Sequence, residues 1–138
     1  MYQLDRQKMG EEQLLLSWDG FEKMTQNSFR DLLGDVDFAD VTLVTEDGNQ
    51  INSHKIILSS CSPFFDNILR KNPHQNPLLY LKDIQYAELQ KLLVFMYVGQ
   101  CEIAQTELDT FLATAKALQV KGLDDLEASV EVKQKATL

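Results

Sequence analysis

The segment 41–53 constrains the fold most, because it predicts two short strands joined by a tight turn. Its first half, Val41–Thr45, is rich in β-branched residues, and its second half, Gln50–Ser53, returns after the turn Glu46–Asn49. The Asp47-Gly48 pair within that turn is a strong short-range signal for a hairpin. We therefore expect an antiparallel hairpin and, with it, a sheet at the centre of the domain.

The rest of the chain predicts two more strands and a larger number of helices. Strands are expected at 13–18 and 78–81, where short apolar runs are bounded by turn residues. Helical spacing is found at 21–33, 54–61, 63–69, 86–97 and 106–118. Ser53 is the predicted cap of the second of these helices, and Ser62 followed by Pro63 is the predicted start of the third. This order predicts an α+β domain, a small sheet flanked by a cluster of helices.

Composition and charge bound the domain organisation. The 138 residues include 13 basic and 21 acidic side chains, for a formal charge of −8. We expect a loose arm at 1–12, one domain at 13–126 and a polar tail at 127–138. An acidic chain without a basic patch is not expected to contact nucleic acid. The short apolar runs predict no membrane span and no secretory signal.

Enzymatic chemistry has little support in the sequence. The chain has two histidines, His54 and His74, and lacks a glycine-rich phosphate loop, a nucleophile elbow and a metal-ligand cluster. Cys61, seven residues after His54, provides one conceivable nucleophile and base, but no third group to orient them is evident. We predict a non-enzymatic protein with no cofactor and no metal, in which Cys61 and Cys101 are reduced thiols.

The segment 14–18 predicts an interaction surface. Leu14, Leu15 and Leu16 precede Trp18, so a strand here is apolar on both faces. A peripheral strand of that kind leaves an apolar face and an edge exposed unless another chain covers them. A second inference concerns Asp40, which stands directly before a buried-type strand and so needs a partner; Lys55 is the nearest candidate.

Four segments in order resemble the signature of the BTB/POZ domain. They are Phe38–Val44, Ser53–Phe65, Leu93–Gly99 and Leu118–Leu123. Within that superfamily the chain is most similar to the tramtrack group of arthropod-type transcription factors, through Leu16-Ser17-Trp18 and the stretch 72–83. Ser17 stands where that group usually has a basic residue, and Asp19-Gly20 where it usually has a polar pair.

The resemblance implies self-association through a two-fold dimer, or a higher oligomer. In members with an N-terminal strand, that strand pairs with a strand of the partner chain. The implied surface comprises Leu14, Leu15, Leu16, Trp18, Phe21, Met24, Phe29, His54, Ile57 and Leu58. Asp40 and Lys55 take the positions of the family's charged pocket pair, in agreement with the pairing inferred above.

The resemblance also implies a role in the nucleus. It predicts an oligomerisation module of a transcription or chromatin factor, with other BTB proteins and co-regulators as further partners and DNA contacts left to other segments. The alternative is a substrate adaptor of a cullin-type ubiquitin ligase. Such adaptors usually carry a hydrophobic-x-Glu element after the third helix, and Ile68–Gln75 contains no glutamate.

Overall fold

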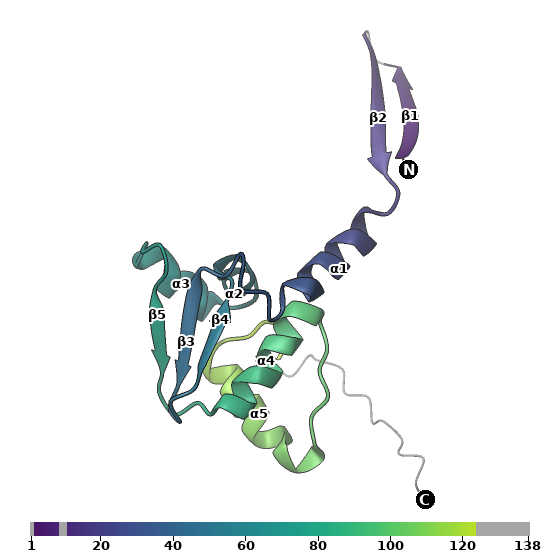
Figure 1. Ribbon diagram of the computed structural model, residues 1–138. Coiled ribbons are helices and arrows are strands. Elements are labelled where there is room, and N and C mark those ends of the chain that lie inside the picture. Colours follow the sequence, from purple (N-terminus) through teal and green to yellow (C-terminus); the bar gives the residue numbers. More distant parts are fainter. Residues whose placement is uncertain (1, 9–10, 124–138) are drawn as a thin grey trace, which may run out of the picture.

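The computed structural model describes residues 2–8 and 11–123; for 2–8 it gives the backbone only. Within these described residues, five strands and five α-helices, with one 3-10 turn, follow one another as shown in Figure 1. The strands are β1 Tyr2–Lys8, β2 Glu12–Trp18, β3 Val41–Thr45, β4 Gln50–Ser53 and β5 Leu78–Leu81. The helices are α1 Phe21–Leu32, α2 Lys55–Cys61, α3 Pro63–Lys71, α4 Tyr86–Val98 and α5 Leu108–Ala117, with the 3-10 turn at Gln105–Glu107.

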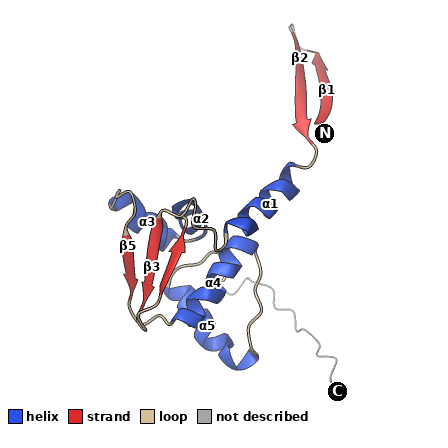
Figure 2. Ribbon diagram, in the orientation of Figure 1, coloured by secondary structure: helices blue, strands red, loops and turns tan. Residues whose placement is uncertain are grey.

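The central sheet has three strands in the order β4-β3-β5. β3 and β4 form the predicted antiparallel hairpin, with Leu43 opposite Ile51, whereas β5 runs parallel to β3 with Leu79 opposite Leu43. Gly48 adopts a positive φ of 86°, and its N–H donates to the Thr45 carbonyl at 2.9 Å, which closes the turn. The prediction of a small sheet flanked by helices is confirmed (Figure 2).

The core lies between one face of this sheet and the helices. Along β3 buried residues alternate with half-buried ones, so Val41, Leu43 and Thr45 point inward. Helices α2 to α5 supply most of the remaining core. The largest fully buried side chains of these helices are Ile57, Leu58, Phe65, Leu89 and Leu92. Burying each such side chain contributes about 1.5–3 kcal/mol to the free energy of folding.

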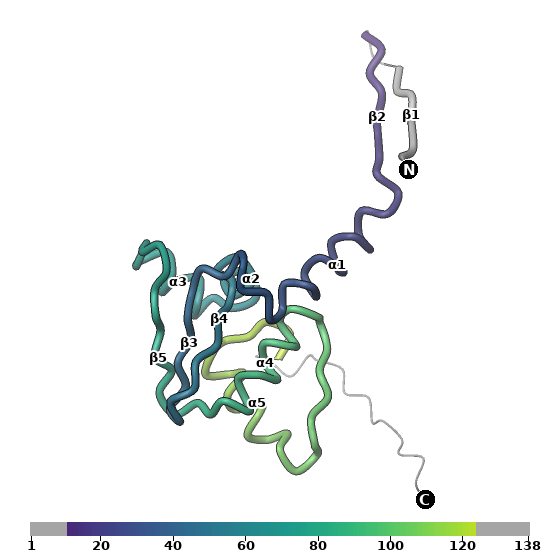
Figure 3. Tube along the Cα trace, in the orientation of Figure 1, coloured from purple at the N-terminus to yellow at the C-terminus, as the bar shows by residue number. Residues whose placement is uncertain are grey.

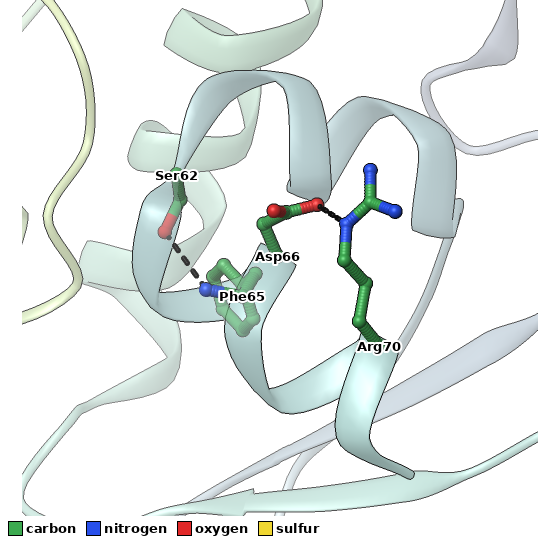
Figure 4. Close-up of polar contacts among 4 residues, drawn as sticks. All are labelled: Ser62, Phe65, Asp66 and Arg70. Atoms are coloured by element: carbon green, nitrogen blue, oxygen red, sulfur yellow. Dashed lines mark hydrogen bonds and ion pairs between the residues drawn. The ribbon is translucent and has the colours of Figure 1, made fainter. Parts of the chain in front are cut away.

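Ser62 joins two parts of the core. Its hydroxyl oxygen accepts the N–H of Phe65 at 3.1 Å, and its O–H donates to the Leu118 carbonyl at 2.5 Å. Pro63 follows at the first helical position, where a missing N–H has no cost. The predicted cap of α3 is thus confirmed (Figure 4), and the Ser62 O–H also ties the start of this helix to Leu118 at the end of α5.

Two sequence expectations differ from the structure. Ser53 ends β4 and does not cap α2. The first N–H of that helix, that of Lys55, donates instead to the carboxylate of Asp40.

The sequence predicts a loose arm before residue 13, yet Tyr2–Lys8 forms β1, an antiparallel partner of β2. The polar segment 1–12 lacks the regular alternation of apolar and polar residues that predicts a strand. β1 forms because it pairs with β2, which provides hydrogen-bonding partners for its backbone. The boundaries at 12–13 and 126–127 stay predictions, and the tail at 127–138 lies outside the described residues.

The N-terminal elements stand apart from this body. The hairpin of β1 and β2 projects from the N-terminal end of α1, far from the central sheet (Figure 1), and Figure 3 shows the path of the backbone from β2 into α1. None of the residues of α1 is buried, and only its C-terminal end, at Leu32 and Leu33, packs against the core. Within the described residues, no helix is long and apolar enough to cross a lipid bilayer.

Candidate protein-interaction surface

The strand β2 and the helix α1 expose a series of large apolar side chains. Leu14, Leu15, Leu16, Trp18, Phe21 and Phe29 are all exposed, with Leu16 at 62% of its surface, and Met24 is half-buried. Folded monomers rarely leave a contiguous apolar surface of this kind in water. We call this set, with Met24, the N-terminal apolar surface.

Two aromatic rings connect the strand to the helix within this surface. Trp18, at the end of β2, meets Phe21, at the start of α1, edge to face with ring centroids 5.4 Å apart. Such pairs add about 0.5–1.5 kcal/mol beyond the burial of area. Both rings stay more than half exposed, so the contact holds the strand to the helix and still presents apolar area outward.

The predicted surface residues on α2 occupy a different place. His54, Ile57 and Leu58 are buried in the core, where they have almost no surface to offer another chain. Ile56, which is not among the predicted surface residues, is 68% exposed. The helix is where it was expected, but its apolar run Ile56-Ile57-Leu58 covers both faces, and periodicity alone did not tell which residue faces water.

His54 is held by Tyr97 of α4. Its backbone N–H donates to the Tyr97 hydroxyl at 3.0 Å, and its ring nitrogen Nδ1 lies 2.7 Å from the same oxygen. Burial raises the pKa of Tyr97 to about 12, so the hydroxyl keeps its proton at neutral pH. These contacts connect the start of α2 to α4 and give His54 a structural role.

Asp40 and Lys55 meet, though not as the side-chain ion pair that was predicted. The Asp40 carboxylate accepts the backbone N–H of Lys55 at 2.7 Å, at the first residue of α2. The Lys55 ammonium donates instead to the backbone carbonyl of His74. The carboxylate therefore satisfies a helix N-terminus, where negative charge is favoured.

A shallow surface cavity of about 550 Å³ lies beside these two residues. Its floor is α2 and α3, and it contains the ion pair of Arg70 Nε with Asp66 Oδ1 at 2.8 Å (Figure 4). Ile56 is also in its wall. The lining comprises Asp40, Lys55, Ile56, Ser59, Ser60, Asp66, Leu69 and Arg70.

The outer face and edge of the central sheet form a second exposed area. Leu78 and Tyr80 of β5 are both more than half exposed, and the register places them beside Thr42 and Val44 of β3. On the opposite edge, β4 exposes the amides Gln50 and Asn52. The β5 edge is thus the more apolar of the two edges of this sheet. The apolar run of β5 does not by itself distinguish an edge strand from a central one.

The residues considered for catalysis do not form a reactive site. Burial raises the pKa of the Cys61 thiol, against the opposing charge of Lys121, so at neutral pH the thiolate needed for attack is scarce. The His54 Nδ1 atom is engaged by Tyr97, and Cys61 Sγ lies 3.5 Å from the Met96 carbonyl. Among the described residues, no group of three or more His, Cys, Asp or Glu side chains is placed to hold a metal ion.

Comparison with known proteins gives consistent results. A family model described as BTB/POZ domain matches residues 29–135. Among curated relatives from Drosophila melanogaster, the Longitudinals lacking protein-like is 41% identical over 121 residues, which cover 88% of this chain and 94% of that protein. The sex determination protein fruitless is 40% identical over 90% of this chain, and the tramtrack protein, alpha isoform, 36% identical over 86%. These matches span only 13% of fruitless and 14% of tramtrack.

Solved structures share the fold. The BTB domain of human gigaxonin superposes with a TM-score of 0.66 and 23% identity, covering 87% of this chain and 94% of that chain. The BTB domain of zebrafish PATZ1 gives a TM-score of 0.65 and 19% identity, covering 76% of this chain and 88% of that one. At these identities the likeness concerns the fold.

Proposed function

Because this chain belongs to the BTB/POZ domain family, we propose that it is a protein-interaction module that joins two copies of itself. The observation that carries the proposal is the N-terminal apolar surface. It is built by a strand and a helix of which no residue is buried by the chain's own fold. A second copy that covered it would remove these side chains from water and supply the main driving force for association.

The proposed contact has two parts. The helix α1 packs against its counterpart and against the exposed side of α2 around Ile56. The strand β2 pairs with the edge strand β5 of the partner, because that edge offers apolar neighbours in Leu78 and Tyr80, whereas β4 offers amides. Apolar cross-strand pairs each contribute about 0.2–1 kcal/mol.

The resemblance to the tramtrack group supports a further proposal about the location and the role of this module in the cell. We place the module in the nucleus, as the part of a transcription or chromatin factor that joins chains, with other BTB proteins and co-regulators as further partners. Joining two chains raises the effective concentration of whatever DNA-binding segments they carry. The formal charge of −8 keeps such a module away from the phosphate backbone and leaves that contact to other segments.

Light scattering coupled to size-exclusion chromatography tests the proposal on the 138-residue chain. We expect at least two copies per particle at micromolar concentration. Changing Leu15→Asp together with Leu16→Asp should give monomers with an intact thermal transition, because charge on a pairing strand becomes desolvated. The matched control adds the same charge at two exposed polar positions outside the proposed contact, Gln90→Asp and Gln105→Asp, and should keep the wild-type mass.

Two outcomes contradict the proposal. A monodisperse wild-type monomer shows that the N-terminal apolar surface does not join copies of this chain. An unchanged mass in the doubly charged variant shows that β2 takes no part. Tight, saturable binding of a cullin N-terminal domain would instead favour the ligase-adaptor role.

A further inference from the structure

The strand β4 borders a second groove of the body, which the proposed contact between two copies does not use. The groove has a volume of about 330 Å³ and lies between β4, the helix α4 and the loop that follows α1. All four residues of β4 line it, together with the apolar side chains of Leu33, Val36, Leu93 and Val94. We call it the β4 groove. None of the described residues that line it is charged.

Two hydrogen bonds hold β4 and α4 side by side at the two ends of this groove. Asp47 Oδ2, in the turn before β4, accepts the N–H of Tyr86, the first residue of α4, at 3.3 Å. Just after β4, the N–H of His54 donates to the hydroxyl of Tyr97, near the end of α4, at 3.0 Å. The helix therefore follows the strand along its length (Figure 1), and the groove between them is part of the fold.

The outer edge of β4 offers backbone groups to an added strand. Among the described strands β4 pairs only with β3, so its second edge has no strand neighbour. The Ser53 carbonyl accepts the N–H of Asp40 at 3.1 Å and so faces β3. Because the backbone groups of successive residues in a strand point to opposite edges, those of Asn52 and Gln50 point outward. Each of these two residues thus presents one N–H and one C=O for pairing.

Carboxylates stand at both ends of this uncharged groove. Asp35 and Asp37 belong to the loop that leads into β3, beside the last residue of β4, and Glu46 and Asp47 lie in the turn before its first residue. A hydrogen bond from the Thr45 hydroxyl lowers the pKa of Asp47, which keeps that carboxylate charged. An occupant with an uncharged middle and a basic residue at each end is complementary to this pattern.

We propose that the β4 groove binds an extended peptide segment of a partner protein. The segment pairs with the outer edge of β4 and so adds a strand to the central sheet, a general mode of peptide recognition. One large apolar side chain of the segment fills the groove, and basic residues before and after it meet the carboxylates. The volume of about 330 Å³ is near the lower end of the range of about 300–1,000 Å³ for ligand pockets, which suits a side chain.

Selection from a library of random peptides on the 138-residue chain tests this inference. The wild-type chain is the target, and fluorescence polarisation then measures the binding of each enriched peptide. We expect the enriched peptides to share one large apolar residue with arginine or lysine on both sides. On binding, the N–H groups of Gln50 and Asn52 should become protected from hydrogen exchange, whereas that of Ser53, which faces β3, should change little.

Two variants of Asn52 test whether the peptide pairs as a strand. Asn52→Pro removes the outward N–H but not the bonds to β3, and should weaken peptide binding at least about tenfold. The matched control Asn52→Ala keeps this N–H, and binding should change less than about twofold. Both variants lose the hydrogen bond that the Thr42 hydroxyl donates to the Asn52 side chain, so that loss cancels in the comparison.

A second pair of variants tests the groove itself. Val36 is 62% exposed, so Val36→Arg should leave the melting temperature nearly unchanged. It places bulk and positive charge in the groove and should weaken peptide binding at least about tenfold. The matched control Gln105→Arg lies in the 3-10 turn and should bind as the wild type does. If Asn52→Pro lowers the melting temperature, this second pair decides in its place.

Several outcomes overturn the inference. They are a library without enriched peptides, enriched peptides with acidic flanks, and Gln50 and Asn52 amides that stay unprotected on binding. Equal binding by the two Asn52 variants, or by Val36→Arg and Gln105→Arg, does so as well. A smaller particle mass of Val36→Arg alone would show that a second copy of the chain occupies the groove instead. The proposed function is tested separately, because a chain that stays monomeric can still bind the peptide.

Discussion

Asp40 shows how a single carboxylate connects segments that the sequence keeps apart. It precedes β3, yet its oxygen satisfies the first N–H of α2, fifteen residues later. The sequence predicts that Asp40 needs a partner and offers Lys55 as the nearest candidate; in the structure the Asp40 carboxylate accepts the backbone N–H of Lys55. The sequence does not predict that the donor is the backbone N–H of Lys55, because the identity of a residue does not tell which of its atoms lies nearest to a neighbour.

Substitutions of Asp40 and Lys55 distinguish a hydrogen bond to the backbone N–H of Lys55 from an ion pair with its side chain. Asp40→Ala should lower the free energy of unfolding by about 1 kcal/mol, the usual cost of losing a helix-capping acceptor. Asp40→Asn keeps an acceptor oxygen and should cost clearly less. Lys55→Ala keeps the backbone N–H, so urea unfolding should show it to be milder than Asp40→Ala. If Lys55→Ala lowered the free energy of unfolding as much as Asp40→Ala does, the result would support a side-chain ion pair instead.

Tyr97 gives the fold a dependence on alkaline pH. Its pKa of about 12 in the fold exceeds the ordinary value of about 10. The contribution of the Tyr97 hydroxyl to the free energy of unfolding is therefore complete below about pH 10 and is lost as the pH rises towards 12. Tyr97→Phe leaves the buried N–H of His54 without its acceptor and should cost about 1–3 kcal/mol at pH 7.

The matched control for Tyr97 is the exposed Tyr80. Tyr80→Phe should change the free energy of unfolding little. The difference between wild type and Tyr97→Phe should shrink as the pH rises above 10, measured by urea unfolding at equal protein concentration. A constant difference up to pH 12 would contradict the assigned pKa.

At the level of elements, α2 has two faces with different tasks. Ile57 is 1% exposed and Ile56 is 68% exposed, although they are neighbours of the same type. Ile57→Ala should lower the free energy of unfolding by about 2–5 kcal/mol. Ile56→Ala should leave the melting temperature of the subunit nearly unchanged but weaken the dimer in a dilution series. Equal effects of the two changes on both measurements would contradict this division.

The elements differ in how well the sequence predicts them, and the reason is local. The Asp47-Gly48 turn and the Ser62-Pro63 start are signals that act over a few residues, so these boundaries were predicted well. β1 has no such signal and depends on β2 for its conformation. The buried and exposed sides of α2 depend on packing against α4, which is distant in sequence.

For the whole molecule, net charge predicts how association responds to salt. Each chain carries a formal charge of −8, so two chains in contact repel each other. Salt screens that repulsion over a Debye length of about 10 Å at about 0.1 M. The proposed dimer should therefore tighten between about 0.02 and 0.3 M salt, measured by analytical ultracentrifugation. Weakening over that range would show that attractive ion pairs dominate the interface.

The fold as a whole could be predicted from the sequence. Which apolar residues form the core and which stay exposed could not. The family signature lies in segments that build the body, so the α+β architecture and the N-terminal strand were both predicted. Which apolar residues stay outside the body, as Leu14–Leu16 do and Ile57 and Leu58 do not, is decided by packing. Only the three-dimensional arrangement separates those two groups.

The separation of the hairpin from the body has an evolutionary consequence. In the proposed assembly, substitutions in β2 would change partner preference without reaching the core that keeps the domain folded, because the two sets of residues do not overlap. Recognition and stability would then evolve independently of each other.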